Sequence, residues 1–207
     1  PSAVGAVTLN VGAASFLSDA GSNNTAATQF NWVYDGTGPT ITITATDGSN
    51  AVSDSSTTND STLTVTFTSS EATSNFAVGD ITVTNGSLSN FAATSSTVYT
   101  ATFTPAADGA VTIDVGAASF TDDAGNDNTA ATQFNWIYDT TPPTMTITAA
   151  EGADGFTSND STLALTFTSS EATSNFAVGD ITVTNGSLSN FAATSSTVYT
   201  ATFTPAA

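Results

Sequence analysis

The sequence predicts an all-β fold of tandem antiparallel β-sandwiches, and three observations support this prediction. Apolar and polar residues alternate with a period of two in many short segments, which is typical of half-buried strands. The same segments recur after about 100 residues, a period that suits one compact domain per repeat. No segment carries the apolar spacing or the boundary signals of a helix.

The repeat is nearly exact. Residues 61–107 return at 161–207 with two changes, and residues 5–48 return with moderate changes at 109–152. The two spacings differ by four residues, which are lost within "SNAVSDSSTTND", so this segment is expected to be an exposed loop tip. The repeats divide the chain into the C-terminal part of one unit, a complete unit and the N-terminal part of another, at residues 1–35, 36–139 and 140–207.

Each expected strand of the complete unit has one apolar face and one face rich in threonine. In "TITITAT", for example, Ile41, Ile43 and Ala45 alternate with threonines, which suit the solvent face of a sheet. In chain order the strands are expected at 40–46, 61–68, 80–86, 87–93, 96–104, 110–115 and 131–139. The Asn-Gly pair in "TNGS" predicts a hairpin turn between the third and fourth strands. About seven antiparallel strands per repeat describe an immunoglobulin-like sandwich, with two sheets facing across one apolar layer.

The charge of the chain restricts its partners. It has 18 acidic residues and no Lys, Arg or His, so its formal net charge is −18 and no two side chains can form a salt bridge. Water, backbone N–H groups or bound cations must therefore stabilise the carboxylates. Nucleic acid is excluded as a partner because phosphate binding depends on Lys and Arg. No apolar run is long enough for a membrane helix, so membrane insertion is not expected.

Enzymatic activity is not expected. Without His, Cys or Lys, only paired carboxylates could perform acid–base or glycosidic chemistry. The pair formed by Glu71 and Asp80 recurs in each repeat beside a domain junction, which is a poor place for a catalytic cleft.

Acidic residues gather where one repeat meets the next. If the strands alternate in direction, the loops 70–80 and 116–128 lie at the end of the sandwich that the preceding linker enters. Such loops supply the oxygen ligands that Ca²⁺ prefers, although the commoner role of Asp in them is a local turn hydrogen bond. The predicted metal ligands are Asp35, Glu71, Asp80, Asp122, Asp123 and Asp127 at this junction, and Asp139, Glu171 and Asp180 at the next.

The segments "TVTFTSSEATSNFAVGDITVTNGSLSNF", "YTATFTPAADGAVTIDVGAASFTDDAGNDNTAA" and "YDTTPPTMTIT" resemble the bacterial Ig-like repeats of large extracellular adhesins and biofilm surface proteins. The resemblance covers the whole chain. It implies an extracellular or cell-surface stalk or extender module, with Ca²⁺ at junctions between domains. By position, it assigns Asp35, Glu71, Asp80 and Asp122 as the candidate ligands.

A different reading is a ligand-binding adhesive module that recognises a glycan or a host or matrix protein through its loops. Phe76, Phe91 and Phe120 lie near loops and are the candidate contact residues, but we expect them to plug the ends of the sandwich.

The partial units at the two ends each lack what the other contains. Residues 140–207 would miss their last two strands, and residues 1–35 would be two strands with nothing to pack on. Either the chain is a stretch of a longer tandem array, which is the preferred interpretation, or one copy completes the next by strand complementation. Both alternatives make neighbouring repeats or chains the expected partner, arranged head to tail.

Overall fold

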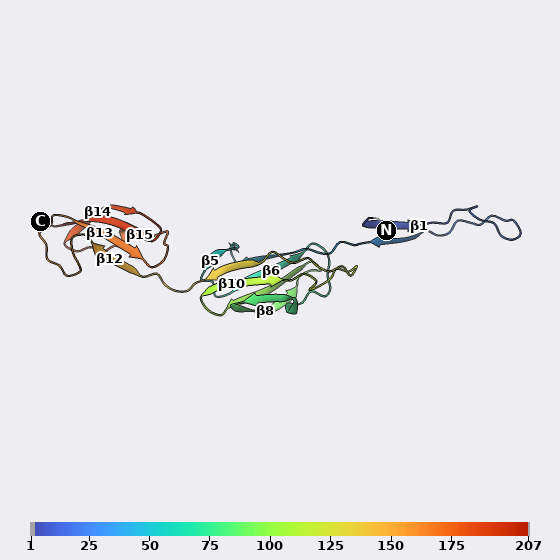
Figure 1. Cartoon of the computed structure of the whole chain (residues 1–207), viewed down its shortest axis with the longest axis horizontal. Helices are drawn as coiled ribbons and strands as arrows, with labels where there is room; N and C mark the ends of the chain where they lie inside the picture. Colours follow the sequence, from blue (N-terminus) through green and yellow to red (C-terminus); the bar gives the residue numbers. More distant parts are fainter. Residues whose placement is uncertain (1–2, 207) are drawn as a thin grey trace. The chain divides into compact units, whose positions relative to one another are not determined.

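The computed structural model describes residues 3–206 (Figure 1). The chain divides after Thr140 into two compact units, and each is described by itself. Strands dominate both units, and among residues 3–206 the only helical segments are two single 3₁₀ turns, at Val78–Asp80 and Val178–Asp180. No helix in this range has the length and apolar character needed to cross a membrane. The all-β prediction is confirmed.

The complete sandwich of the first unit has two facing sheets. The five-stranded sheet has the order β4 (Ala51–Val52), β3 (Ile41–Thr46), β6 (Leu63–Ser69), β9 (Val98–Pro105) and β8 (Gly86–Ala93). The four-stranded sheet has the order β5 (Ser56–Thr58), β11 (Phe134–Tyr138), β10 (Gly109–Val115) and β7 (Ile81–Thr84). All seven strands expected from the sequence are present, and the immunoglobulin-like architecture is confirmed.

The segment expected to be a loop tip instead contains two short strands. β4 pairs with β3, and β5 pairs in parallel with β11, which is the one departure from the expected antiparallel pairing in this unit. The loop before β5 is fixed to β11 because the Asp54 carboxylate accepts hydrogen bonds from the backbone N–H and the side-chain amide of Asn135, at 2.8 and 3.0 Å. Because polar side chains make these contacts, the segment shows no alternation of apolar and polar residues from which its two short strands could be predicted.

The prediction of a hairpin at "TNGS" is wrong, because β7 and β8 belong to different sheets. Asn85 adopts a positive φ of 52° as the turn prediction requires, but its side-chain amide donates to the Ala107 carbonyl oxygen at 2.7 Å. This hydrogen bond directs the chain across the sandwich to pair with β9. Gly86 starts the next strand where a Cβ would overlap the Phe103 ring, so only glycine fits this crossing.

The core lies between the two sheets and consists of their inward-facing residues. Val65, Phe67, Phe103, Val111 and Ile113 have no measurable solvent exposure. Aromatic side chains close one end of this layer: the Phe76 ring lies 4.9 Å from the Phe120 ring and 5.1 Å from the Tyr99 ring, and the Phe91 ring stacks on Tyr99. The expectation that the loop phenylalanines plug the end of the sandwich is confirmed.

The remaining strands belong to the two partial repeats. Near the N-terminus, β1 (Gly5–Leu9) and β2 (Phe30–Tyr34) form a two-stranded antiparallel sheet. The second unit has a single four-stranded sheet in the order β12 (Met145–Ala149), β13 (Leu163–Ser169), β15 (Val198–Pro205) and β14 (Gly186–Ala193). The boundaries of the three domains inferred from the repeats stay a prediction.

Candidate metal centre

Three carboxylates from three separate segments meet at one end of the complete sandwich. Asp35 lies in the linker before β3, Glu71 in the loop after β6, and Asp122 in the loop after β10. One carboxylate oxygen of each lies within 4.8 Å of the others, and the three residues line a hollow together with Val33, Ala72, Asp123 and Ala124. No cationic side chain exists anywhere in the chain to balance this charge.

Asp122 is held by its own loop. Its Oδ1 accepts hydrogen bonds from the backbone N–H groups of Ala124 and Asn126 at 2.9 and 2.8 Å, and its Oδ2 accepts one from the Asn126 side-chain amide at 2.9 Å. Gly125 completes the turn with a φ of +90°. The carboxylate therefore performs the turn-forming role expected as the alternative to metal binding, and it also faces Asp35 and Glu71.

The linker that carries Asp35 is fastened to the same loop. The Asn126 amide also reaches the Asp35 carbonyl oxygen at 3.4 Å, and the Thr129 N–H donates to the Pro39 carbonyl at 2.9 Å. Between these two points Gly38 packs so closely that a Cβ would overlap the carbonyl oxygen of Asp127. The position of Asp35 is thus set by direct contact between backbones.

The loop that carries Glu71 is tied to both neighbours. The Ser70 N–H donates to the Thr40 carbonyl and the Ser70 hydroxyl accepts from the Thr40 N–H, each at 2.9 Å. Across the loops, the Asn75 side chain accepts from the Thr121 N–H at 3.1 Å and donates to the Thr121 hydroxyl at 3.2 Å. These bonds fix the three acidic segments relative to one another.

The electrostatics of the cluster differ between its members. The pKa of Glu71 is raised, first by desolvation and then by the negative charges of Asp35 and Asp122. The pKa of Asp122 is lowered, chiefly by the side-chain hydrogen bond from Asn126 and further by backbone N–H groups of its loop, against an opposing desolvation effect. Of these two carboxylates, Glu71 is the one whose negative charge the protein compensates less.

Glu71→Gln is expected to raise the melting temperature of the first unit at pH 7 in EDTA. A carboxylate whose pKa is raised on folding contributes stability below its unfolded pKa, and that contribution is lost as the pH rises through the folded pKa. Glutamine has no charge to be repelled, so the variant should melt at a higher temperature than the parent chain at pH 7. This difference in melting temperature should vanish near pH 4, since an unfolded Glu has a pKa of about 4.3.

Fluorescence melting curves at a series of pH values test this prediction, with buried Trp136 reporting on the first unit. Glu171→Gln is the matched control, because its twelve-residue surroundings are identical in sequence but no Asp122 equivalent follows it in this chain. A gain for Glu71→Gln that stays constant down to acid pH would contradict the electrostatic explanation.

The structure does not bring the other predicted ligands into the cluster of three. The carboxylates of Asp80 and Asp180 accept hydrogen bonds from the backbone N–H groups of Ala77 and Ala177, at 2.8 and 2.9 Å, which close the 3₁₀ turns. Asp123 lines the hollow and is exposed, and exposed Asp127 contributes the backbone carbonyl that Gly38 approaches.

The predicted ligands of the next junction are placed separately. The Asp139 N–H donates to the Thr58 carbonyl at 3.1 Å, at the end of β11. Glu171 keeps the local backbone contact of Glu71, with its N–H 3.4 Å from the Ser169 hydroxyl. A metal site formed by Asp139, Glu171 and Asp180 stays a prediction.

The sequence analysis missed the asparagines that build the site. Besides Asn75 and Asn126, Asn128 is buried and uses its whole side chain: Oδ1 accepts from the N–H groups of Ser119 and Phe120, and Nδ2 donates to two carbonyl groups. Asn126 and Asn128 stand in "GNDN", where they alternate with a glycine and an aspartate. A turn-rich loop this long needs internal amide hydrogen bonds to stay ordered.

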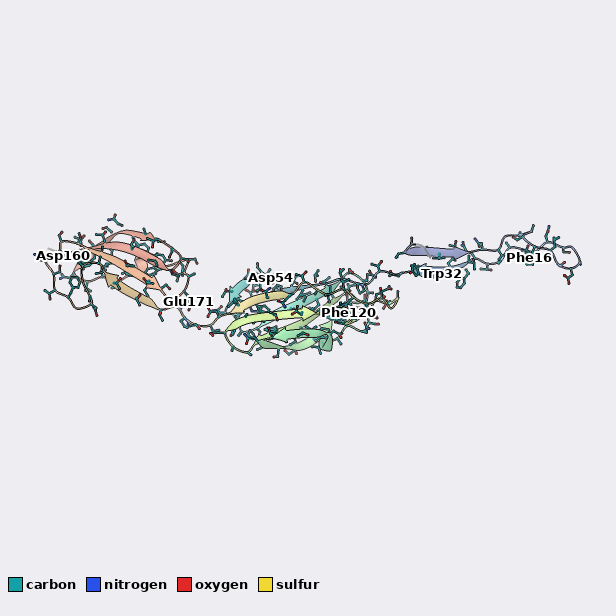
Figure 2. All side chains as sticks on the ribbon, in the orientation of Figure 1. Phe16, Trp32, Asp54, Phe120, Asp160 and Glu171 are labelled. Carbon is teal, nitrogen blue, oxygen red and sulfur yellow. The ribbon has the colours of Figure 1, made fainter. Side chains whose placement is uncertain are left out.

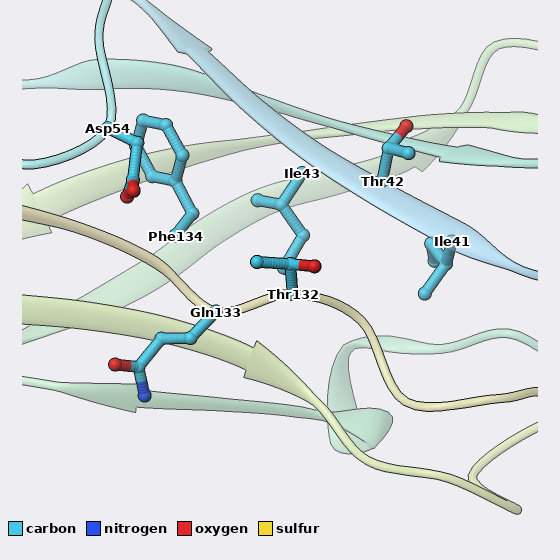
Figure 3. Close-up of a pocket in the computed structure, with 7 residues that line it drawn as sticks. All are labelled: Ile41, Thr42, Ile43, Asp54, Thr132, Gln133 and Phe134. Atoms are coloured by element: carbon cyan, nitrogen blue, oxygen red, sulfur yellow. The ribbon is translucent and has the colours of Figure 1, made fainter.

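A second hollow lies beside β3 on the same sandwich (Figure 3). Ile41, Ile43 and Phe134 line it with polar residues from the chain before β11, and Asp54 is its one acidic group. Because the Asp54 carboxylate is engaged by Asn135, this hollow presents no free charged group to a ligand.

Comparisons with known proteins agree with this architecture. A family model described as a bacterial Ig-like domain matches residues 35–137 and 139–207. Searches of curated proteins and of solved structures found no match.

Proposed function

The chain belongs to the family of bacterial Ig-like domains, and we propose that it serves as a structural extender module of a cell-surface adhesin or extracellular filament, with Ca²⁺ binding at its junctions. The observation that carries this proposal is the meeting of linker residue Asp35 with Glu71 and Asp122 of the following sandwich. A stalk needs connections between domains that resist bending. A cation at this place would connect the linker to the domain it enters.

The chemistry of the cluster fits a hard cation. Three carboxylates within 4.8 Å repel one another, and the chain supplies no positive group to relieve the repulsion. Ca²⁺ accepts carboxylate oxygens in irregular geometry and takes its remaining ligands from carbonyl groups or water. The raised pKa of Glu71 marks the charge that a bound cation would relieve.

The adhesive alternative has less support. Phe76 and Phe120 are buried and half-buried Phe91 packs against Tyr99, so the residues considered for a contact surface belong to the core. The proposed role is non-enzymatic, places the module outside the cell, and requires neighbouring repeats as partners.

Calcium titration of the 207-residue chain is expected to raise the melting temperature of the first unit. A ligand that binds only the folded state stabilises it by about 2.7 kcal/mol when its concentration is 100 times Kd. Trp136 fluorescence follows the melting, isothermal titration calorimetry counts the bound ions, and small-angle scattering follows the length of the particle. Mg²⁺ should act more weakly, because it demands near-octahedral geometry and loses its water reluctantly.

The variants Glu71→Gln and Asp122→Asn should abolish the calcium response, and Glu171→Gln should preserve it. An unchanged melting temperature and no heat of binding at millimolar calcium would reject the metal site. A rise in melting temperature that all three variants share would place the calcium elsewhere.

A further inference from the structure

We propose that β5 and β11 form a mechanical clamp that holds the complete sandwich closed when the chain is pulled from both sides. The clamp consists of residues 54–58 and 135–139, which pair in parallel and are also bonded through side chains. Such a clamp rests on the extender role proposed above, because a stalk carries tension along its chain. Its contacts lie within the complete unit, and none of them involves calcium.

Tension enters and leaves the complete unit at opposite ends. β6 runs back along β3, and β9 runs back along β6. β10 returns after the short turn 106–108, and β11 runs back along β10. β3 and β11 therefore point the same way, so the chain enters before β3 at one end of the sandwich and leaves after β11 at the other. A pull on the flanking chain draws these two strands lengthwise in opposite directions.

Strands that are drawn lengthwise resist separation more than strands that are peeled apart. The hydrogen bonds between neighbouring strands run across the strand direction, perpendicular in antiparallel pairs and slanted in parallel pairs. Under a lengthwise pull all the bonds of a pair carry the load together. Peeling loads the bonds one after another, so each can break by itself. The path of the chain through the complete unit thus favours resistance to tension.

β5 joins the incoming part of the chain directly to the outgoing strand. Its parallel register places Ser56 opposite Trp136 and Thr58 opposite Tyr138. Tension draws β5 toward the entry end and β11 toward the exit end, so the pair is loaded lengthwise. β3 is held less well, because β6 pairs along its whole length but β4 pairs with it at only two positions. We expect β3 to detach first, and the load then falls on β5 and β11.

β11 cannot slide without disturbing the core. It lies between β10 and β5 in its sheet, so both of its edges are paired. Its inward side chains Phe134 and Trp136 are buried, and the Trp136 ring lies 4.9 Å from the Phe103 ring of the facing sheet. Lengthwise movement of β11 must draw these aromatic rings out of a close-packed interior. This packing adds to the resistance of the hydrogen bonds.

Hydrogen bonds reinforce the clamp at both of its ends. The Asp54 carboxylate, which lines the hollow in Figure 3, accepts from the N–H and the side-chain amide of Asn135 at 2.8 and 3.0 Å. The Ser55 N–H donates to the Asn135 carbonyl oxygen at 2.7 Å. At the exit end the Asp139 N–H donates to the Thr58 carbonyl oxygen at 3.1 Å. The bonded region is therefore longer than β5 itself.

The backbone of Ser55 is strained where the clamp begins. Its φ is +63°, in the left-handed region that residues other than Gly, Asn and Asp seldom adopt. Strained conformations persist where surrounding bonds hold them, and they concentrate at functional positions. The strain at Ser55 therefore indicates that its contact with β11 is firmly held.

A separate contact opposes peeling of β11 from its exit end. The Asp108 carboxylate accepts hydrogen bonds from the N–H and the hydroxyl group of Thr140, at 2.9 and 2.8 Å. The chain that leaves β11 is thus bonded to the turn before β10. Tension must break this contact before it can lift the end of β11 sideways.

The test is the unfolding of the 207-residue chain under constant force in EDTA, with handles at its two termini. An extended chain spans about 3.3–3.6 Å per residue, so residues 39–139 release about 350 Å and residues 141–206 no more than about 240 Å. The length released therefore identifies the complete unit. Its unfolding rate under force is the quantity compared between variants.

Asp54→Ala is expected to raise this unfolding rate about 10-fold, the effect of losing one hydrogen bond to a charged group. Asp54→Asn keeps an oxygen acceptor for the N–H of Asn135 and should retain most of the resistance. Asp54 is exposed, so neither change removes a core contact. An unchanged rate for Asp54→Ala would overturn the clamp.

Asp47→Ala is the matched control. The Asp47 carboxylate also accepts two backbone N–H groups, from Ser49 and Asn50 at 2.7 and 2.6 Å, but these bonds lie within the turn between β3 and β4. This change should leave the unfolding rate under force at the value of the parent chain. If the two alanine variants accelerate unfolding equally, the effect is a general loss of stability and the clamp is rejected.

The direction of the pull provides a test that leaves the clamp residues unchanged. The chain contains no cysteine, so Asn59→Cys supplies a single attachment point in the exposed turn after β5. A pull between this point and the C-terminal handle separates Thr58 from Tyr138 first and peels β5 from β11. The complete unit should open at a lower force than with handles at both termini. An equal or higher force would contradict the proposal.

The presence of EDTA keeps this test separate from the calcium site. If the clamp is rejected, the calcium titration still decides whether Asp35, Glu71 and Asp122 bind a cation. If calcium has no effect in that titration, a faster unfolding of Asp54→Ala under force still supports the clamp.

Discussion

Trp136→Ala is expected to lower the free energy of unfolding of the first unit by about 3–5 kcal/mol, the usual cost of removing a large aromatic side chain from a core. Trp136 is 1% exposed, and its ring lies 4.9 Å from the Phe103 ring across the sandwich. Its replacement leaves a cavity between the two sheets that the strands cannot close without breaking their pairing. Chemical denaturation followed by circular dichroism measures the loss.

Trp32→Ala is the matched control, because Trp32 occupies the same repeat position and is 41% exposed. Trp32, labelled in Figure 2, lies in β2 and outside the two sheets of the sandwich, so this change should leave the unfolding transition of the first unit in place. Equal losses for the two tryptophans would mean that the hairpin of residues 5–34 is packed in the isolated chain, which contradicts the exposures described above.

Gly38→Ala is expected to destabilise the first unit by about 1–3 kcal/mol, the usual cost of overpacking, and to weaken calcium binding. A Cβ at this position would overlap the backbone carbonyl of Asp127, and a backbone atom cannot rotate away as a side chain can. The linker must shift, so Asp35 moves away from Glu71 and Asp122. Denaturation curves and calcium calorimetry on the same samples measure the two effects.

Gly36→Ala in the same linker is the control, since its Cβ would meet only the movable end of the Tyr34 side chain at 3.0 Å. If Gly38→Ala binds calcium as tightly as the parent chain, the position of Asp35 does not matter for the site and the cluster of three is not the ligand set.

Strand positions could be predicted from the sequence because burial alternates with period two along each strand. In β3 the apolar residues named from the pattern, Ile41, Ile43 and Ala45, are the buried ones. The assignment of strands to sheets could not be predicted from this alternation. The Asn85–Gly86 pair satisfies the local rule for a hairpin, but the hydrogen bond from Asn85 to Ala107 joins residues far apart in sequence and sends the chain to the other sheet.

The meeting of Asp35, Glu71 and Asp122 followed from loop placement, because alternating strand directions put these loops at one end. The separation of Asp80 from them could not be foreseen. Its carboxylate accepts the N–H group of Ala77 three residues earlier, and "VGD" does not distinguish this local bond from a ligand that points outward. The role of the asparagines that organise the loops could not be predicted either, because it depends on hydrogen bonds to residues far away in the sequence.

The order in which the strands of the complete unit pair has a consequence for how such a repeat is synthesised. In the complete unit β7 pairs with β10, and β5 pairs with β11. The residues of β10 and β11 leave the ribosome only after the five-stranded sheet has been synthesised. At about 5–20 residues per second, the last hairpin arrives a few seconds later. Until then the apolar face of the five-stranded sheet has no cover, and synthesis of the β10–β11 hairpin supplies the strands that close the core.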